Sequence, residues 1–331
     1  MRAAIVGIEG TALSVAEASL FAAFPPAGVI LFARNVENPR QLAGLTAGLR
    51  AGLPPEAVLM VDQEGGRVAR LRPPAWRAHP AAAWLGRLYD ADRTAGLRAA
   101  WLTGALIGCE ASAAGIDVVT APVLDLGLPG MSAVVGDRAL HAEPRAAARL
   151  GRALAGGLLA AGIQPVMKHI PGHGQARVDS HVELPTVATT ALARDLLPFA
   201  VNAALPWAMV AHIRYTHWDA AHPASLSEIV IEKIIRGRIG FQGVLVSDDL
   251  AMQAIAGTPA ARATGTLAAG ADLALYCSGE RDANREVLAA LPELSAAGRL
   301  RLAHARAMAD ASRKELDPDL LGAERDRLLG A

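Results

Sequence analysis

The sequence lacks an excess of charge of either sign. Its 331 residues include 32 Lys plus Arg and 32 Asp plus Glu, so the formal net charge is zero. Proteins that bind nucleic acid or an anionic membrane surface in a general way need excess positive charge to neutralise phosphate groups. The balance therefore argues against a nucleic-acid partner and against a membrane-surface protein.

Cysteines and long apolar stretches are also scarce. The two cysteines, Cys109 and Cys277, cannot form a disulfide framework and lack the close spacing of a zinc motif, so we expect buried free thiols. No uninterrupted apolar stretch approaches the ~18 residues of a membrane-spanning helix. The first apolar run ends at Glu9, which is too early for the core of a signal peptide. We therefore expect a cytoplasmic protein.

Apolar residues make up 52% of the chain, which excludes a disordered protein. They gather in short runs that are apolar nearly throughout, as in strands that helices cover on both faces of a parallel sheet. Helical patterns separate these runs, for example over 39–51, 94–114, 143–161 and 225–238, the last starting with a capping pattern from Ser225 to Glu228. The runs are 3–8, 28–33, 57–61, 116–120, 164–167, 207–211, 243–246 and 271–276.

Eight strands that alternate with helices predict an α/β fold with a parallel sheet, and most simply a single (β/α)8 TIM-type barrel. An open, doubly wound sheet has the same alternation and stays open as an alternative. No G-x-G-x-x-G turn follows the first strand, which weakens a dinucleotide-binding interpretation. No linker or low-complexity segment divides the chain, so we expect one domain over residues 1–331.

Polar side chains follow several of the predicted strands. In a barrel, the carboxyl ends of all strands meet at one pocket, and active sites lie there. A single carboxylate after a strand can instead cap the next helix. We expect that role for Asp249, at the start of a predicted helix over 250–256. The other candidates are Asp62, Asp125, Lys168, His169, His212 and Asp248.

A loop of roughly 20 residues follows the fifth strand, longer than the usual connection in such folds. Within it, Asp179 and His181 are two residues apart, so an extended backbone places both side chains on the same side. A carboxylate bonded to an imidazole fixes its tautomer and raises its pKa, which suits a general acid/base. A solvated Asp-Ser-His turn is the alternative.

The strand-end residues also suit a sugar substrate. Asp248, held ionised at the end of a buried strand, could attack an anomeric carbon or stabilise an oxocarbenium ion. Lys168 and Arg138 could donate hydrogen bonds to sugar hydroxyls, and Asp62 could accept them. No metal is expected, because the chain has no H-E-x-x-H motif and no H-x-H after the first strand.

Six segments together resemble glycoside hydrolase family 3, and within it the bacterial β-N-acetylhexosaminidases. They occur in the order of that family, and the similarity extends from Gly28 to at least Leu275. The segments are 28–35, 61–71, 136–138, 168–174, 179–181 and 247–252.

The resemblance implies a TIM-type barrel and a retaining mechanism through a covalent glycosyl-enzyme. Asp248 matches the nucleophile of the family, His181 its acid/base and Asp179 the partner of that histidine. The implied substrate is a peptidoglycan fragment, an anhydro-muropeptide that loses its terminal N-acetylglucosamine (GlcNAc) in cell-wall recycling. No cofactor or metal is implied, and a monomer is the default expectation. The positions that match the GlcNAc-binding residues are Asp62, Arg70, Arg138, Lys168 and His169.

Three alternatives stay open. Most retaining glycosidases pair two carboxylates, and a histidine in place of one of them lowers the negative charge near the anomeric carbon. An anionic acceptor could then approach, as in a phosphorylase. A sugar-binding barrel without activity and a metal-dependent hydrolase are the other two.

Overall fold

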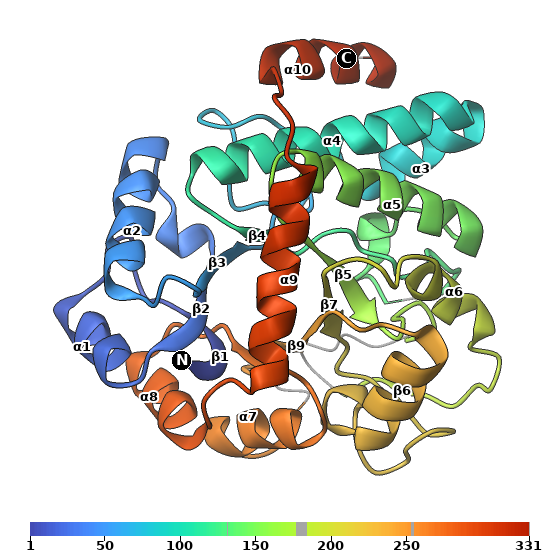
Figure 1. The fold of residues 1–331 in the computed structure, drawn as a ribbon. Coiled ribbons are helices and arrows are strands. Elements are labelled where there is room, and N and C mark those ends of the chain that lie inside the picture. Colours follow the sequence, from blue (N-terminus) through green and yellow to red (C-terminus); the bar gives the residue numbers. More distant parts are fainter. Residues whose placement is uncertain (131, 177–183, 253–254, 331) are drawn as a thin grey trace.

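Eight parallel strands close into a barrel, with helices around the outside (Figure 1). The computed structural model describes residues 1–130, 132–176, 184–252 and 255–330. The barrel strands are β1 (Arg2–Gly7), β2 (Pro26–Leu31), β3 (Val58–Val61), β4 (Val118–Val119), β5 (Gln164–Ile170), β7 (Trp207–Val210), β9 (Val244–Asp249) and β10 (Leu273–Tyr276).

The barrel confirms the predicted fold class. Each of the eight apolar runs overlaps one barrel strand, although β2 starts two residues earlier than predicted and β5 and β9 end three residues later. β1 pairs with both β2 and β10, which joins the first strand to the last. The open-sheet alternative is therefore wrong.

Helices surround the barrel, and a short parallel pair of strands, β6 (Thr186–Val187) and β8 (Arg214–Tyr215), lies outside it. A π-helix spans Ile229–Ile239, and 3-10 turns span Ala33–Asn35, Gly136–Arg138 and Ala224–Leu226. The α-helices are α1 (Val15–Ala23), α2 (Pro39–Gly52), α3 (Ala82–Ala91), α4 (Arg93–Ala113), α5 (Pro144–Ala160), α6 (Ala193–Val201), α7 (Pro259–Ala268), α8 (Arg281–Ala290), α9 (Ala296–Ser312) and α10 (Pro318–Leu329).

Two predicted helix starts are wrong. Ser225 does not cap the helix that follows it, because its hydroxyl bonds to His212; the Ser227 hydroxyl instead accepts from the N–H of Val230, at 3.2 Å. Residues 250–252 form a turn rather than the start of a helix. Asp249 accepts from the N–H of Ala251 in this turn and also from the N–H of Cys277, just after β10, which ties the turn to the barrel.

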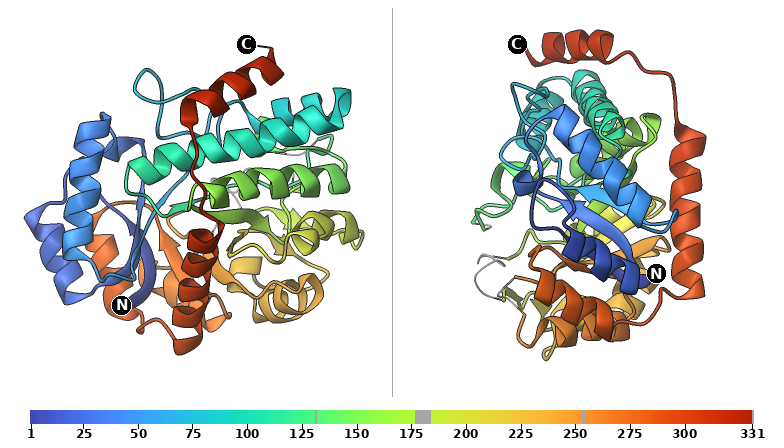
Figure 2. Two further views of the ribbon diagram at one scale, coloured as in Figure 1. Left: turned by 45° about the horizontal axis from the view of Figure 1, so that its top comes forward. Right: turned by 90° about the vertical axis from the view of Figure 1, so that its left-hand side faces the viewer.

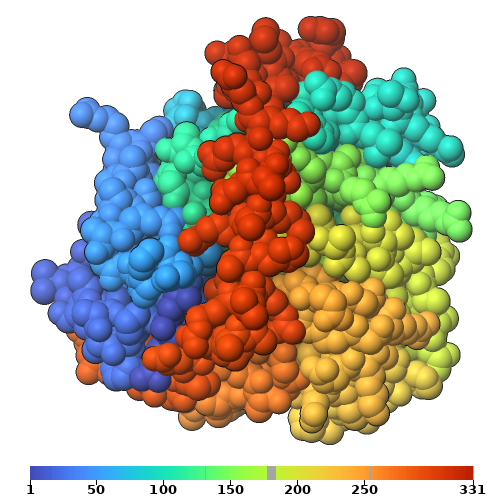
Figure 3. Space-filling model, in the orientation of Figure 1, coloured from blue at the N-terminus to red at the C-terminus, as the bar shows by residue number. Residues whose placement is uncertain are grey.

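Side chains that point into the barrel form a core of their own. Alternate residues of each strand face inward, so Val244 and Val246 lie inside while Leu245 faces the helices. The amino-terminal end of the barrel, opposite the carboxyl ends of the strands, is closed by α9. Leu302 and Ala305 of this helix belong to the interior cluster. Figure 2 shows α9 along one side of the molecule, and Figure 3 shows it crossing that face.

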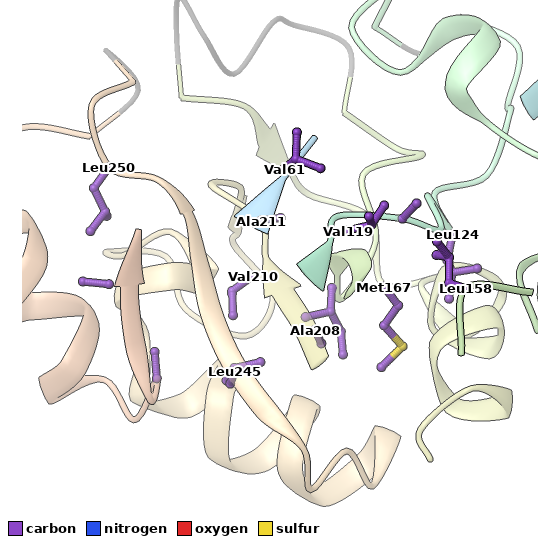
Figure 4. Packing of buried hydrophobic residues seen from close by; sticks show 14 of the residues in the cluster. Val61, Val119, Leu124, Leu158, Met167, Ala208, Val210, Ala211, Leu245 and Leu250 are labelled. Atoms are coloured by element: carbon purple, nitrogen blue, oxygen red, sulfur yellow. The ribbon is translucent and has the colours of Figure 1, made fainter. Parts of the chain in front are cut away.

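A second and larger core lies between the strands and the helices. Figure 4 shows part of it, where Val61, Met167 and Leu245 point outward from β3, β5 and β9. These side chains are at most 1% exposed, so the helices cover the outer face of the barrel completely here. Strands buried on both faces explain why the runs are apolar nearly throughout.

The C-terminal helix α10 packs against α4 at the periphery (Figure 1). An ion pair joins them: Arg98 Nε lies 2.7 Å from Glu324 Oε1, and its NH2 lies 2.6 Å from Oε2. Both cysteines are free thiols, as predicted, but Cys109 is only half-buried. Within the described part of the chain, no helix combines the length and the apolar character needed to cross a membrane.

Candidate active site

The inward-facing positions of the strands change from apolar to polar at the carboxyl end of the barrel. In four strands, a polar residue stands two positions beyond the last interior apolar residue. These residues are Asp62 just after β3, Thr120 just after β4, Lys168 on β5 and Asp248 on β9. A strand repeats its facing every two residues, so these side chains stand directly above the apolar core. Asp62, Lys168 and Asp248 line a pocket of about 330 Å³, whose floor includes the core residues Ile30, Met209 and Leu275.

Asp62 is the centre of one ion cluster in the pocket. Lys168 Nζ lies 3.1 Å from Asp62 Oδ1, and Arg70 NH2 lies 3.1 Å from Oδ2. The Thr120 hydroxyl donates to Asp62 and accepts from Lys168 Nζ at 2.8 Å. Burial alone would raise the pKa of Asp62, but Lys168 and Arg70 hold it well below its usual range. Asp62 is therefore an ionised hydrogen-bond acceptor.

Glu64 joins Lys168 to Arg138, a further cation on the same side of the pocket. Its carboxylate accepts from Arg138 Nε and NH2, both at 2.8 Å, and lies 2.5 Å from Lys168 Nζ. The side chain is only 6% exposed. Burial alone would raise the pKa of Glu64, but Lys168 and Arg138 keep it below its usual value. Glu64 thus fixes the position of two cations that face the pocket.

Asp125 holds His169 in one orientation. Its Oδ2 lies 2.7 Å from His169 Nδ1, and its Oδ1 accepts the backbone N–H of His173 at 2.7 Å. Burial would raise the pKa of Asp125, but His169 and the hydrogen bonds keep it below its usual value. Because an ionised carboxylate only accepts hydrogen bonds, Nδ1 carries the proton, and Nε2 is the nitrogen that can meet a ligand.

Asp248, on β9, lines the same pocket as Lys168, Arg70 and Arg138. Its Oδ1 accepts the backbone N–H of Asp249 at 2.8 Å. Burial would raise the pKa of Asp248, but His169 and His212, with that hydrogen bond and Lys168, keep it below its usual value. An ionised carboxylate inside a pocket can act as a nucleophile or stabilise a developing positive charge.

His212 is not a pocket residue, although sequence reasoning placed it at a strand end. It is fully buried, with Nε2 3.0 Å from the carbonyl oxygen of Asp249 and Nδ1 2.7 Å from the Ser225 hydroxyl. A carbonyl can only accept, so Nε2 carries the proton and the serine donates to Nδ1. Burial lowers the pKa of His212, in accord with a neutral ring. His212 therefore supports the backbone beside Asp248.

The structure brings most of the predicted site residues together. Asp179 and His181 lie outside the described residues. Asp125 was a strand-end candidate without an assigned role, and Glu64 was not predicted as a site residue, although it stands in the polar segment after β3. Within the described ranges, no three His, Cys, Asp or Glu side chains gather as a metal site would require. The predicted residues that line the pocket are Asp62, Arg70, Arg138, Lys168, His169 and Asp248.

Comparisons with known proteins agree with this geometry. Residues 9–313 match the family model described as the glycosyl hydrolase family 3 N terminal domain. Two relatives named beta-hexosaminidase, from Alkalilimnicola ehrlichii and Chromobacterium violaceum, are each 41% identical; the matches cover 94% and 97% of this chain and 90% and 92% of theirs.

Solved structures give the same assignment. NagZ from Neisseria gonorrhoeae, in complex with N-trifluoroacetyl-D-glucosamine, superposes with a TM-score of 0.88 and 34% identity, covering 99% of this chain and 98% of the other. LpqI of M. tuberculosis has a TM-score of 0.75 and 27% identity, over 94% and 92% of the chains. The chain therefore belongs to glycoside hydrolase family 3, and it is a glycoside hydrolase whose relatives are beta-hexosaminidases.

Proposed function

We propose that the protein is a retaining β-N-acetylhexosaminidase that removes a terminal GlcNAc through a covalent glycosyl-enzyme. The observation that carries this proposal is the position of Asp248. It is an ionised carboxylate in a pocket whose other wall carries Asp62, Lys168 and Arg138. A sugar held by that wall would present a ring face to Asp248.

The reaction would proceed in two displacements. Asp248 attacks the anomeric carbon while His181, paired with Asp179, gives its proton to the leaving glycosidic oxygen. The product is a glycosyl ester of Asp248 and a free alcohol. His181 then takes a proton from water, the water oxygen attacks the anomeric carbon, and the ester bond breaks. Two inversions at that carbon restore its original configuration.

The charged side chains that share the pocket with Asp248 would bind the sugar hydroxyls. Asp62 accepts from hydroxyl groups, while Arg70, Arg138 and Lys168 donate to them. His169 presents Nε2 because Asp125 occupies Nδ1. Charge-assisted bonds of this kind orient a sugar strongly, which aligns its anomeric carbon with the nucleophile.

The names of the relatives narrow the substrate class. The relatives are beta-hexosaminidases, and the gonococcal NagZ structure contains an N-acylated glucosamine. We infer a 2-acylamino sugar as the substrate here, and GlcNAc at the end of an anhydro-muropeptide as the physiological form. We further infer one catalytic domain over residues 1–331, acting as a cytoplasmic monomer in cell-wall recycling.

A mechanism-based label tests the nucleophile. Incubation with a 5-fluoro N-acetylglucosaminide, followed by peptide mass analysis, should place the label on Asp248. The Asp248→Ala variant should show almost no turnover and no label, whereas Asp282→Ala, which changes an exposed carboxylate on α8, should behave as wild type. A label on another carboxylate, or full turnover by Asp248→Ala, would refute the proposal.

The choice of acceptor separates a hydrolase from a phosphorylase. Lys168 and Arg138 both lie within ion-pair distance of Glu64, and Lys168 also of Asp62, so their charge is already compensated within the pocket. That compensation favours water over phosphate as the acceptor. The products of turnover with and without inorganic phosphate decide the question: GlcNAc in both cases supports the hydrolase, and a sugar 1-phosphate supports the phosphorylase.

A further inference from the structure

The segment that follows β2 has no part in the mechanism above, although it belongs to the family pattern. Asn35, which is fully buried, fixes its backbone. The Asn35 side chain accepts the N–H of Phe32 at 2.9 Å and donates to the carbonyl oxygens of Ile8 at 3.1 Å and Gly10 at 2.8 Å. The position of Phe32 is therefore set by contacts to the end of β1.

Arg34 lies beside Phe32 and is itself anchored. Its Nε donates to the carbonyl oxygen of Ile8 at 2.9 Å, and its NH2 donates to that of Cys277 at 2.6 Å. The guanidinium carbon lies over the Phe32 ring, 4.9 Å from the ring centroid. Arg34 thus ties the Phe32 ring to the ends of β1 and β10, where the barrel closes.

A second guanidinium shares the same ring. The guanidinium carbon of Arg70 lies 5.3 Å from the Phe32 centroid, and both residues line the pocket. Arg70 has one ion pair, with Asp62, and its buried Nε has no hydrogen-bond partner among the described residues. The Phe32 ring is therefore a principal restraint on the plane of Arg70, in addition to Asp62.

We propose that Phe32 is a positioning residue that holds the Arg70 guanidinium against Asp62, where the two meet the sugar. The negative face of an aromatic ring attracts a cation and favours guanidinium groups that lie over it. Arg34 carries the same charge as Arg70 but is fixed by two carbonyl groups, so it holds the ring in place without competing for Asp62. The inference rests on the proposed role of Arg70 and Asp62 in sugar binding.

Kinetics with an aryl N-acetyl-β-glucosaminide test the proposal. Phe32→Leu and Phe32→Met keep apolar volume but remove the ring face. Each should raise KM about fivefold, as expected for the loss of the cation–π contact between Phe32 and Arg70. Each should change kcat less than about twofold. Phe32→Tyr, which keeps the ring, should restore KM. In an Arg70→Ala background, Phe32→Leu should have no further effect on KM.

A matched control lies at the other end of the barrel. The guanidinium carbon of Arg2 is 5.4 Å from the Phe24 ring centroid, where β1 and β2 begin. Phe24→Leu removes the same kind of contact away from the pocket and should leave KM unchanged. A rise in KM for Phe24→Leu would mean that loss of a ring acts through the fold, and would overturn the proposal.

The remaining outcomes separate this inference from the proposed function. If Arg70→Ala raises KM but both Phe32→Leu and Phe32→Met leave it unchanged, Phe32 does not position Arg70 and the inference fails. Failure of both Phe32 variants to fold, measured by circular dichroism, would also overturn it, because the ring would then serve the fold. If neither Arg70→Ala nor Asp62→Ala changes KM, the proposed role of these two residues in sugar binding is itself wrong.

Discussion

Replacing Glu64 by glutamine removes one negative charge from the pocket wall and keeps the shape of the side chain. Glu64 makes three charge-assisted contacts, two with Arg138 and one with Lys168. Hydrogen bonds to charged groups contribute about 1.5–3 kcal/mol each, and breaking a buried ion pair costs about 3–5 kcal/mol. Asp62 still neutralises Lys168, and glutamine keeps one acceptor oxygen. We therefore expect the free energy of unfolding to fall by about 3 kcal/mol.

The loss of stability caused by Glu64→Gln should depend on pH in a defined direction. Folding lowers the pKa of Glu64, because Lys168 and Arg138 outweigh the effect of burial. The charged carboxylate therefore stabilises the fold fully above its ordinary pKa near 4.3, and this contribution is lost as the pH falls through the lowered, folded-state pKa. The difference between wild type and Glu64→Gln should be largest near pH 7 and shrink below about pH 4.

Urea unfolding at pH 7 and at pH 3, followed by circular dichroism, measures both differences. Glu324→Gln is the matched control, since Glu324 forms the same two-point contact with Arg98 on the surface. Exposed ion pairs contribute at most about 1 kcal/mol, so this variant should differ little from wild type. A Glu64→Gln protein as stable as Glu324→Gln at pH 7 would refute the reasoning.

Three other substitutions test the site. His181→Ala should reduce turnover of a GlcNAc disaccharide far more than that of an activated aryl glycoside, because a good leaving group needs little protonation; an equal loss in the two assays would contradict the acid assignment. Asp125→Asn should lower kcat/KM about 10- to 100-fold, because His169 loses a charge-assisted bond at Nδ1; an unchanged kcat/KM would show that His169 needs no such support. Tyr215→Phe removes a 2.5 Å bond to the Gly172 carbonyl, so urea unfolding should show about 1 kcal/mol less stability, and equal stability would speak against that bond.

The strands could be predicted because their chemistry is local. A strand buried on both faces must be apolar along its whole length, and each of the eight runs met that condition. The ends of the strands were harder to predict. β9 extends to Asp249 although its last three residues are polar, because Asp248 and Asp249 line the pocket and the Ser247 hydroxyl accepts the N–H of Leu275. Closure of the barrel was not visible in the sequence, since it depends on a pairing between β1 and β10.

The pocket could be predicted only in part. Asp62, Lys168 and Asp248 were predicted because polar residues follow three of the apolar runs, at the expected carboxyl ends of the strands. Glu64 was missed because its role depends on Arg138, 74 residues away in the chain. His212 looked like a pocket residue for the same reason as Lys168, yet it bonds to Ser225 and a backbone carbonyl. Contacts between distant segments decide such roles, and one sequence does not display them.

The filled interior of the barrel has a consequence for the route that substrate and product take. Apolar side chains fill the space below the floor of the pocket, and α9 seals the opposite end. A polysaccharide therefore has no exit through the molecule and cannot thread past Asp248. Substrate must therefore enter, and product must leave, through the mouth of the pocket at the carboxyl ends of the strands.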